Sequence, residues 1–397
     1  MNSINKNRFI SIDILRALTM TLMIFVNDLW SLTGIPRWLE HTSAAEDGMG
    51  LADTVFPAFL FLTGMSIPLS VNYRRSNGDT NQKIVFHIIL RSIALLVMGL
   101  FLVNGEYINE TATGMQRVVW NSICCTCFIL LWNAWPAKLN KWIIGSLKAI
   151  AIVALLFLAW IYRGGEDKEI AGFRTWWWGI LGLIGWAYFV SAVIFTFFGK
   201  NFIIIIVAWL VFIFLCIASH AGWLPDEDLL RTIISPLGDG SMPGFVTGGV
   251  LTTMIFLHFR SINENKKMFG FLFILALFLL LSGFYTRTFW GISKIRATPA
   301  WVLICSSITI IIFMIIYWLS DLKSKSNWFA IIKPAGTNTL LCYLLPYYAY
   351  AIVVLLHFSL PEILLTGFIG LTKSIVFSLL IVICAGWLEK AGIKLKL

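Results

Sequence analysis

The first apolar segment of the chain carries three side chains that hydrocarbon solvates poorly, Asp13, Arg16 and Asn27. On a helix, at about 100° per residue, these three and Met20 fall within about 60° of one another and form one stripe about 21 Å long. Ionisable groups among apolar helices are costly and usually functional, so the stripe predicts the wall of a polar cavity where Arg16 meets an anionic ligand. The alternative is that Asp13 and Arg16 neutralise each other and pack the bundle.

A histidine and an aspartate, His41 and Asp53, flank the start of the second apolar run, which opens Thr54-Val-Phe-Pro57. Histidine exchanges protons near neutral pH, and its imidazole can also carry an acyl group. Asp53 either orients this imidazole or favours the N-terminus of its own helix, where negative charge is stabilised. The pair therefore predicts acid–base or acyl-transfer chemistry.

Two other polar groups open later apolar runs. Gln116 and Arg117 precede the fourth run, and Gly336-Thr-Asn338 precedes the eleventh. Arg117 either contributes to a site or reaches the headgroups at the membrane surface. The seven cysteines show no metal-site spacing with His or Asp and no loop pairing, so we interpret all of them as small buried side chains and predict no metal site.

The elements that position these residues are membrane-spanning helices. The chain of 397 residues is 59% hydrophobic and only 13% charged, with a mean hydropathy of +0.84, and this polarity cannot cover a water-facing surface. A span needs about 20 apolar residues. The sequence predicts an all-α polytopic membrane protein with about twelve spans in one bundle. The predicted spans are 9–32, 51–73, 83–103, 117–133, 142–162, 177–198, 201–219, 243–260, 268–286, 299–320, 336–357 and 363–388.

Two of these spans are atypical. The fourth, 117–133, is short, and the eleventh begins with Pro334, Gly336 and Asn338, which favours a broken helix. The connections are short, so the chain is expected to form a single domain.

The distribution of basic residues predicts the orientation. With the N-terminus in the cytoplasm, eighteen Lys and Arg fall in cytoplasmic segments and ten in outer ones. Both termini are then cytoplasmic, and His41 faces the outside. Most Asp and Glu lie on the outer side, which would attract a cationic substrate such as an amino sugar. The net charge of +10 is attributed to anionic lipid rather than to nucleic acid.

The ordered combination of motifs resembles the heparan-α-glucosaminide N-acetyltransferase family. The matching elements are Ser11-Ile-Asp13-Ile-Leu-Arg16, Val26-Asn27, His41, Leu51-Ala-Asp53-Thr-Val-Phe56-Pro57, Gly114-Met-Gln116-Arg117 and Pro334-x-Gly336-x-Asn338-x-Leu340-x-x-Tyr343. The resemblance is strongest over residues 9–121 and reappears over 334–357. The segment 177–219 resembles a two-helix insertion, and the loop between Asn27 and His41 is longer than in the family.

The resemblance implies an acyltransferase that moves an acetyl group from cytosolic acetyl-CoA to an amino sugar or glycan outside a bacterial cytoplasmic membrane. His41 and Asn27 match the family's catalytic positions, with Asp53 beside them. Asp13, Arg16 and Asn338 are the expected acetyl-CoA contacts, and Glu40, Gln116 and Arg117 the expected acceptor contacts. A homodimer is a family-level expectation.

Two other classes of function fit parts of the pattern. A secondary transporter would also have twelve spans, broken helices and buried charge, although the two halves of this chain show no matching motifs. A scaffold for envelope assembly would leave the polar stripe of the first helix unexplained. Direct transfer by a basic His41 and transfer through an acetylated His41 both remain open from the sequence.

Overall fold

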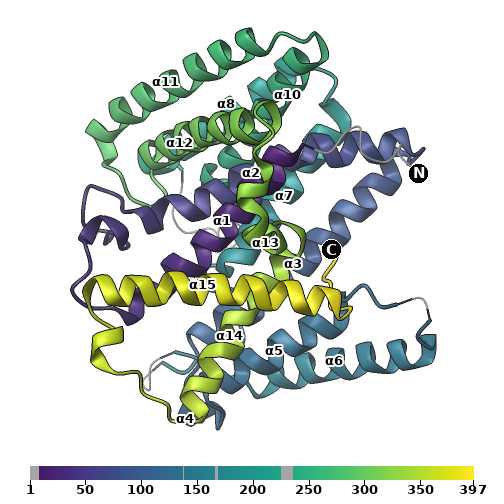
Figure 1. Ribbon diagram of the computed structural model, residues 1–397, viewed down its shortest axis with the longest axis vertical. Helices are drawn as coiled ribbons and strands as arrows, with labels where there is room; N and C mark the ends of the chain where they lie inside the picture. The colour runs from purple at the N-terminus through teal and green to yellow at the C-terminus, as the bar shows by residue number, and fades with distance from the viewer. Residues whose placement is uncertain (1–8, 137, 166–168, 225–235) are drawn as a thin grey trace.

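The computed structural model describes residues 9–136, 138–165, 169–224 and 236–397, and within these ranges it is almost entirely helical (Figure 1). Four basic residues that contributed to the predicted orientation, Lys6, Arg8, Lys168 and Arg231, lie outside the described residues. The helices are α1 (Ile10–Asp28), α2 (Leu51–Ser76), α3 (Asn81–Glu106), α4 (Glu110–Thr113), α5 (Arg117–Trp132), α6 (Lys141–Ile161), α7 (Gly179–Phe198), α8 (Phe202–His220), α10 (Ser241–Ser261), α11 (Asn265–Trp290), α12 (Pro299–Tyr317), α13 (Lys333–Thr337), α14 (Thr339–Leu355) and α15 (Gly367–Lys390).

The prediction of a polytopic helical membrane protein is confirmed. Ten helices of the described ranges are long and apolar enough to cross a membrane. An eleventh candidate is bent by 79° between Ser326–Thr337 and Thr339–Leu355, at the place where the sequence predicts a broken helix. The predicted fourth span is α5, with 16 residues, which is shorter than the length that a bilayer requires. These two elements were also the atypical ones in the sequence.

Contacts between loops agree with the predicted alternation of the spans. Thr33 pairs with Thr366, and Ile108 with Gly164. Thr33, Ile108 and Gly164 belong to loops predicted to be outside, and Thr366 lies near the outer end of the predicted span 363–388. At the other end of the bundle, Asn133 pairs with Leu395, so the C-terminal segment lies beside the loop between α5 and α6. Each pairing joins two segments predicted to lie at the same face of the membrane, while the assignment of either face to the cytoplasm stays a prediction.

Glycines allow the central helices to approach closely. A Cβ on Gly64 of α2 would lie 1.8 Å from the backbone oxygen of Val246 in α10, and one on Gly249 would lie 2.0 Å from that of Phe61. Between α3 and α7, a Cβ on Gly99 would lie 2.3 Å from a backbone nitrogen. Such backbone contacts are typical of helices packed in lipid, where small residues let dispersion forces act between whole helices.

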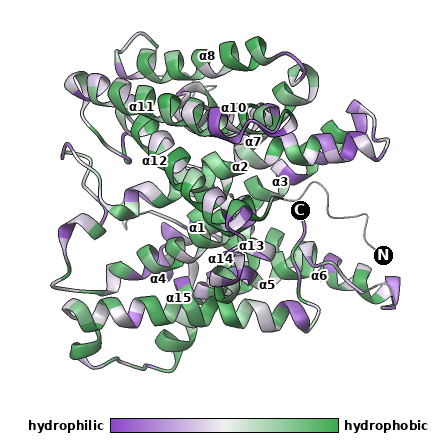
Figure 2. Cartoon of the chain, turned by 45° about the horizontal axis from the view of Figure 1, so that its top comes forward, coloured by the Kyte–Doolittle hydropathy of each residue, from purple (hydrophilic) through white to green (hydrophobic). Residues whose placement is uncertain are grey.

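The segment expected to be an insertion is integrated into the bundle. α7 packs against α2, α3 and α10, whereas α8 packs mainly against α10. Helices α6, α8, α11 and α15 are the least buried of the candidate spans, and they are apolar along most of their length (Figure 2). Their outward faces are the ones that lipid would cover.

Candidate active site

A first cavity, of about 810 Å³, lies toward the end of the bundle predicted to face the cytoplasm. We call it the inner cavity. Asp13, Arg16 and Met20 of α1 line it, so the predicted polar stripe does face a cavity. Its other walls come from α2, α3, α7, α10, α13, α14 and the C-terminal segment. Asp13 and Arg16 also contact each other, as the alternative expects, with 3.4 Å between Arg16 Nη1 and Asp13 Oδ1. Binding of an anionic ligand by Arg16 stays a prediction.

Two arginines bring positive charge to the inner cavity. Arg16 Nη2 donates to Ser66 Oγ at 2.7 Å, which fixes its guanidinium against α2. Arg91 of α3 places its guanidinium 4.7 Å from the centre of the Tyr188 ring in α7. The buried Nε atom of Arg91 has no hydrogen-bond partner within the described part of the chain. Guanidinium groups at a cavity wall are suitable anchors for a phosphate-bearing ligand.

A second cavity, of about 840 Å³, opens toward the other end of the bundle. We call it the outer cavity. Asn27, Glu40, His41 and Arg117 line it, and this brings together four of the residues selected from the sequence. Gln116 is the exposed N-cap residue of α5, immediately before Arg117. Trp30, Glu106 and three tyrosines of α14 complete the wall, which combines aromatic surfaces with two carboxylates.

His41 is held by Asp53. The distance from His41 Nδ1 to Asp53 Oδ1 is 2.7 Å, and the other carboxylate oxygen accepts the backbone N–H groups of Thr42 at 2.9 Å and Gly50 at 3.1 Å. Asp53 is 1% exposed, whereas the side chain of His41 is 46% exposed. When the carboxylate accepts a hydrogen bond from Nδ1–H of the neutral ring, the other ring nitrogen, Nε2, has the free lone pair. Asp53 thus orients the imidazole and caps α2 at the same time.

The loop that carries His41 is shaped by Gly50. A Cβ at this position would lie 1.9 Å from the backbone oxygen of Glu40, so a larger residue would displace the segment next to His41. Asp47 fixes the same loop from the other side, since its carboxylate accepts the N–H of Ile292 at 2.7 Å and contacts Arg287 at 2.9 Å. The N–H of Ile292 lowers the pKa of Asp47, partial burial opposes this shift, and Arg287 adds to it.

A lysine that was not selected from the sequence lies beside the histidine. Lys294, in the loop between α11 and α12, places its Nζ 3.3 Å from His41 Nδ1. Burial lowers the pKa of Lys294, and the nearby carboxylate of Asp53 acts in the opposite direction. Nothing in the spacing of the sequence indicates this contact, because it depends on how a distant loop folds back onto the first outer loop.

Asn27 borders a buried polar cluster. Its neighbour Asp28 is 3% exposed and accepts hydrogen bonds from Lys373 Nζ at 2.6 Å, Ser374 Oγ at 2.6 Å and Tyr350 Oη at 3.0 Å. A buried carboxylate needs such partners, and they fix the end of α1 to α14 and α15. Asn27 itself is exposed to the outer cavity, and its side chain makes no hydrogen bond within the described ranges.

Asn338 lies at the bend between α13 and α14 and is 1% exposed. Its side chain donates to the backbone oxygen of Ile393 at 2.9 Å and accepts the N–H of Leu395 at 3.2 Å. The residues on either side of it, Thr337 and Thr339, line the inner cavity. Asn338 therefore holds the C-terminal segment at the cavity, and its predicted contact with acetyl-CoA stays a prediction.

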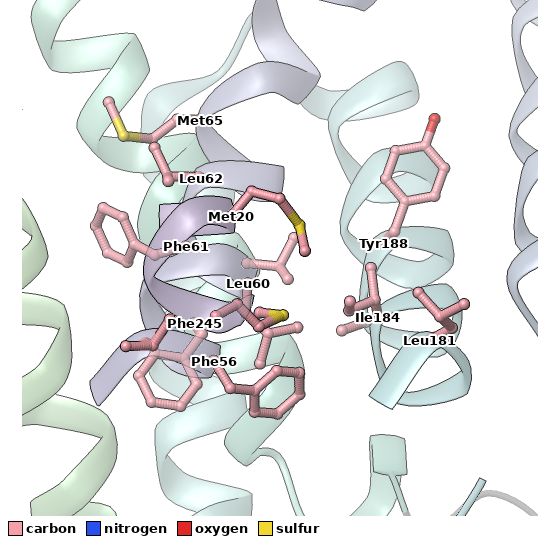
Figure 3. Packing of buried hydrophobic residues seen from close by; sticks show 14 of the residues in the cluster. Met20, Phe56, Leu60, Phe61, Leu62, Met65, Leu181, Ile184, Tyr188 and Phe245 are labelled. Atoms are coloured by element: carbon pink, nitrogen blue, oxygen red, sulfur yellow. The ribbon is translucent and has the colours of Figure 1, made fainter. Parts of the chain in front are cut away.

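The two cavities share three wall residues, Met20, Ile180 and Tyr343. Met20 is 1% exposed and extends from α1 toward the side of α7 that carries Leu181, Ile184 and Tyr188 (Figure 3). The three shared residues separate a cavity lined by arginines from a cavity lined by the imidazole. A flexible ligand that passed between them would join the two ends of the bundle. Within the described residues, no group of His, Cys, Asp and Glu side chains could hold a metal ion.

Comparison with known proteins gives matches in the N-terminal part of the chain. Residues 8–165 match the family described as Heparan-alpha-glucosaminide N-acetyltransferase, catalytic. The Heparan-alpha-glucosaminide N-acetyltransferase of Mus musculus is 36% identical over 102 residues, which are 25% of this chain and 15% of the relative. The Homo sapiens protein of that name is 33% identical over 100 residues, 25% of this chain and 14% of the relative. The matched part is thus about one seventh of the length of these relatives.

Proposed function

From the match of residues 8–165 to the heparan-α-glucosaminide N-acetyltransferase family, we propose that this chain is a transmembrane acyltransferase. It moves an acetyl group from acetyl-CoA in the inner cavity to an amino sugar or glycan in the outer cavity. The observation that carries the proposal is the shared wall of Met20, Ile180 and Tyr343, with the arginines on one side and the His41–Asp53 pair on the other.

The inner cavity fits the donor chemically. Arg16 and Arg91 line this cavity and offer charged donors to phosphate groups. Between these arginines and Met20 the wall is mostly apolar, with Leu95, Leu181 and Ile184 among its residues. An apolar passage suits the uncharged pantetheine arm, which would carry the thioester toward Met20.

The outer cavity fits a cationic or hydroxyl-rich acceptor. Glu40 and Glu106 attract an ammonium group, and the aromatic side chains Trp30, Tyr347 and Tyr350 offer flat surfaces with polar tips for a sugar ring. Arg117 adds a donor for an acidic or hydroxyl group of the same ligand.

The chemistry follows from the position of the two polar residues at the cavity. The amide of Asn27 donates a hydrogen bond to the thioester oxygen as negative charge develops on it. A C–N or C–O bond forms at the carbonyl carbon and the C–S bond breaks, while the acceptor proton goes to His41 Nε2 and then to the leaving thiolate. In the alternative route Nε2 attacks the carbonyl carbon first, the C–S bond breaks and the thiolate leaves. The acceptor then takes the acetyl group as the bond to Nε2 breaks, and its proton passes through His41 to the thiolate. Asp53 stabilises the positive imidazole in both routes.

The proposal is tested with purified protein in proteoliposomes that enclose isotopically labelled acetyl-CoA, with a glucosamine-terminated glycan added outside. Label should appear on the external glycan, and His41→Ala should reduce the rate by at least about 10²-fold. His357→Ala, which removes another exposed histidine, is the matched control. Full turnover by His41→Ala contradicts the mechanism.

The same vesicles distinguish a secondary transporter. A transporter would accumulate labelled amino sugar inside vesicles that contain no acetyl-CoA, and its uptake would not depend on His41. Vesicles sorted by protein orientation also test the predicted sidedness, because only molecules whose inner cavity faces the enclosed acetyl-CoA should react.

A further inference from the structure

Lys294 is fixed in place by contacts to the segment that holds the imidazole. Its loop, residues 291–298, connects α11 to α12 and lies outside the part of the chain that matches the family. At the start of the loop Ile292 donates to Asp47, and after its end Trp301 donates its indole N–H to the backbone oxygen of Asp53 at 2.9 Å. The loop therefore forms one unit with the His41–Asp53 segment.

Two groups compete for one nitrogen of the imidazole. His41 Nδ1 lies 2.7 Å from Asp53 Oδ1 and 3.3 Å from Lys294 Nζ. Nδ1 cannot donate a proton to the carboxylate and accept one from the ammonium group at the same time. The shorter distance belongs to the carboxylate, so Nδ1 carries the proton and Lys294 faces the ring as a positive charge rather than as a hydrogen-bond donor.

We propose that Lys294 is a positioning residue whose positive charge, 3.3 Å from His41 Nδ1, offsets the charge of Asp53 beside the reacting imidazole. The inference rests on the proposed function, in which His41 Nε2 must offer a lone pair to the acceptor proton or to the acetyl group. Lys294 lies outside residues 8–165, the part of the chain that matches the family.

The physical reason is the balance of charge around the imidazole. A buried carboxylate in contact with a histidine stabilises the imidazolium form, in which Nε2 has no lone pair. The carboxylates of Glu40 and Glu106, on the wall of the same cavity, act in the same direction, and Arg117 acts against them from α5. Within the described residues, Lys294 is the only cationic side chain in direct contact with His41. Removing its charge therefore leaves the negative charge around the ring less balanced.

The pH dependence of acetyl transfer tests the proposal. Lys294→Met, which keeps the aliphatic stem and removes the charge, should move the acidic limb of kcat/KM upward by about one pH unit. Activity should be lost several-fold near neutral pH and recovered in more alkaline buffer. Lys294→Arg keeps the charge and should retain the parent profile. Lys294→Gln keeps a hydrogen-bond donor without charge and should follow the Met variant.

The control variants distinguish the effect of losing the charge from the effect of disturbing the fold. Lys267→Met makes the same chemical change at an exposed lysine paired with Glu264 and should leave the profile unchanged. An unshifted acidic limb in both uncharged variants overturns the proposal. A loss of rate that is equal at every pH also overturns it, since that result indicates a purely structural role. If Lys294→Met does not fold, judged by thermal melting in detergent, the Gln variant decides.

A second measurement does not need catalysis. Diethyl pyrocarbonate modifies neutral imidazoles, and peptide mass spectrometry resolves His41 from the four other histidines. The pH midpoint of His41 modification should lie about one unit higher in Lys294→Met than in the parent protein. A shifted midpoint without any acetyl transfer by the parent protein would support the role of Lys294 and refute the proposed function. Acetyl transfer by the parent protein together with an unshifted midpoint would support the proposed function and refute the role of Lys294.

Discussion

The inner and outer cavities are similar in volume but differ in how their polar groups are held. In the inner cavity, Arg16 and Arg91 extend long side chains from helices, and their contacts are to other side chains: Ser66 and Asp13 for Arg16, Tyr188 for Arg91. In the outer cavity, His41 is exposed but its partner Asp53 is buried and accepts two backbone N–H groups. The difference indicates that ligand binding and chemistry require different degrees of order. Several adaptable cations can hold a large charged ligand, whereas proton or acyl transfer needs one imidazole in one orientation.

This comparison predicts a division in kinetic effects. Changes at the outer cavity should lower kcat, because they disturb the reacting group, whereas changes among the arginines should raise KM for acetyl-CoA. The residues of the shared wall should affect transfer without affecting the binding of either ligand. The experiments below are ordered from the largest expected effect to the smallest.

Asp53→Asn should have the largest effect. The amide keeps the shape of the carboxylate but can present an N–H to His41 Nδ1 and so favour the wrong tautomer. We expect kcat to fall by about 10²-fold to 10⁴-fold with little change in KM for acetyl-CoA. Thr54→Val, which removes an adjacent hydroxyl that bonds only within α2, is the control. A near-normal kcat in Asp53→Asn would mean that the imidazole orientation is unimportant.

Met20→Trp tests the shared wall. A larger side chain at this almost fully buried position should close the connection between the two cavities. We expect kcat to fall on the order of 10²-fold, while the Kd of acetyl-CoA from isothermal titration changes little. Met20→Leu, of similar volume, should remain close to the parent protein. Undiminished transfer by the Trp variant would show that the acetyl group takes another route.

Arg16→Met tests the inner cavity. Loss of a charged hydrogen bond to phosphate, worth about 1.5–3 kcal/mol, should raise KM for acetyl-CoA by about ten-fold or more with a smaller change in kcat. Lys323→Met removes an exposed positive charge near the same end of the bundle and controls for surface electrostatics. An unchanged KM together with a lower kcat would indicate that Arg16 acts in the chemical step, and it would contradict the proposed division between effects on KM and effects on kcat.

Asp47→Ala should have the smallest effect. Folding lowers the pKa of Asp47, so its ionised carboxylate stabilises the folded protein at any pH above the unfolded pKa, which is near 3.9. This stabilisation is lost only as the pH falls through the folded pKa. Between about pH 5 and 8 the contribution is therefore constant. We expect a loss of a few-fold in kcat that is independent of pH across this range. A loss that appears only at low pH would contradict the assigned contacts.

Much of this site could be predicted from the sequence because its signals are local. Asp13, Arg16, Met20 and Asn27 share one helix face, and helical periodicity fixes that arrangement before any tertiary contact forms. The broken helix at Asn338 and the short α5 were predictable in the same way, from polar residues and from length. Intramembrane arginine was also a signal, and Arg91 could have been selected on that ground.

Other features required the tertiary structure. Lys294 reaches His41 only because the loop after α11 folds onto the first outer loop, and α7 forms part of the inner wall although the sequence presents its segment as an insertion. Asn338 lies beside the inner cavity, yet its side chain bonds to the C-terminal segment.

The sequence by itself determined the membrane environment, the helices and the polar face of α1, since hydrophobicity and periodicity act over a few turns of one chain segment. Only the tertiary structure decided that this face borders two cavities that meet at Met20, and which distant side chains surround His41. The physical reason is that packing between helices and the hydrogen bonds of loops depend on shapes that residues far apart in the chain make together.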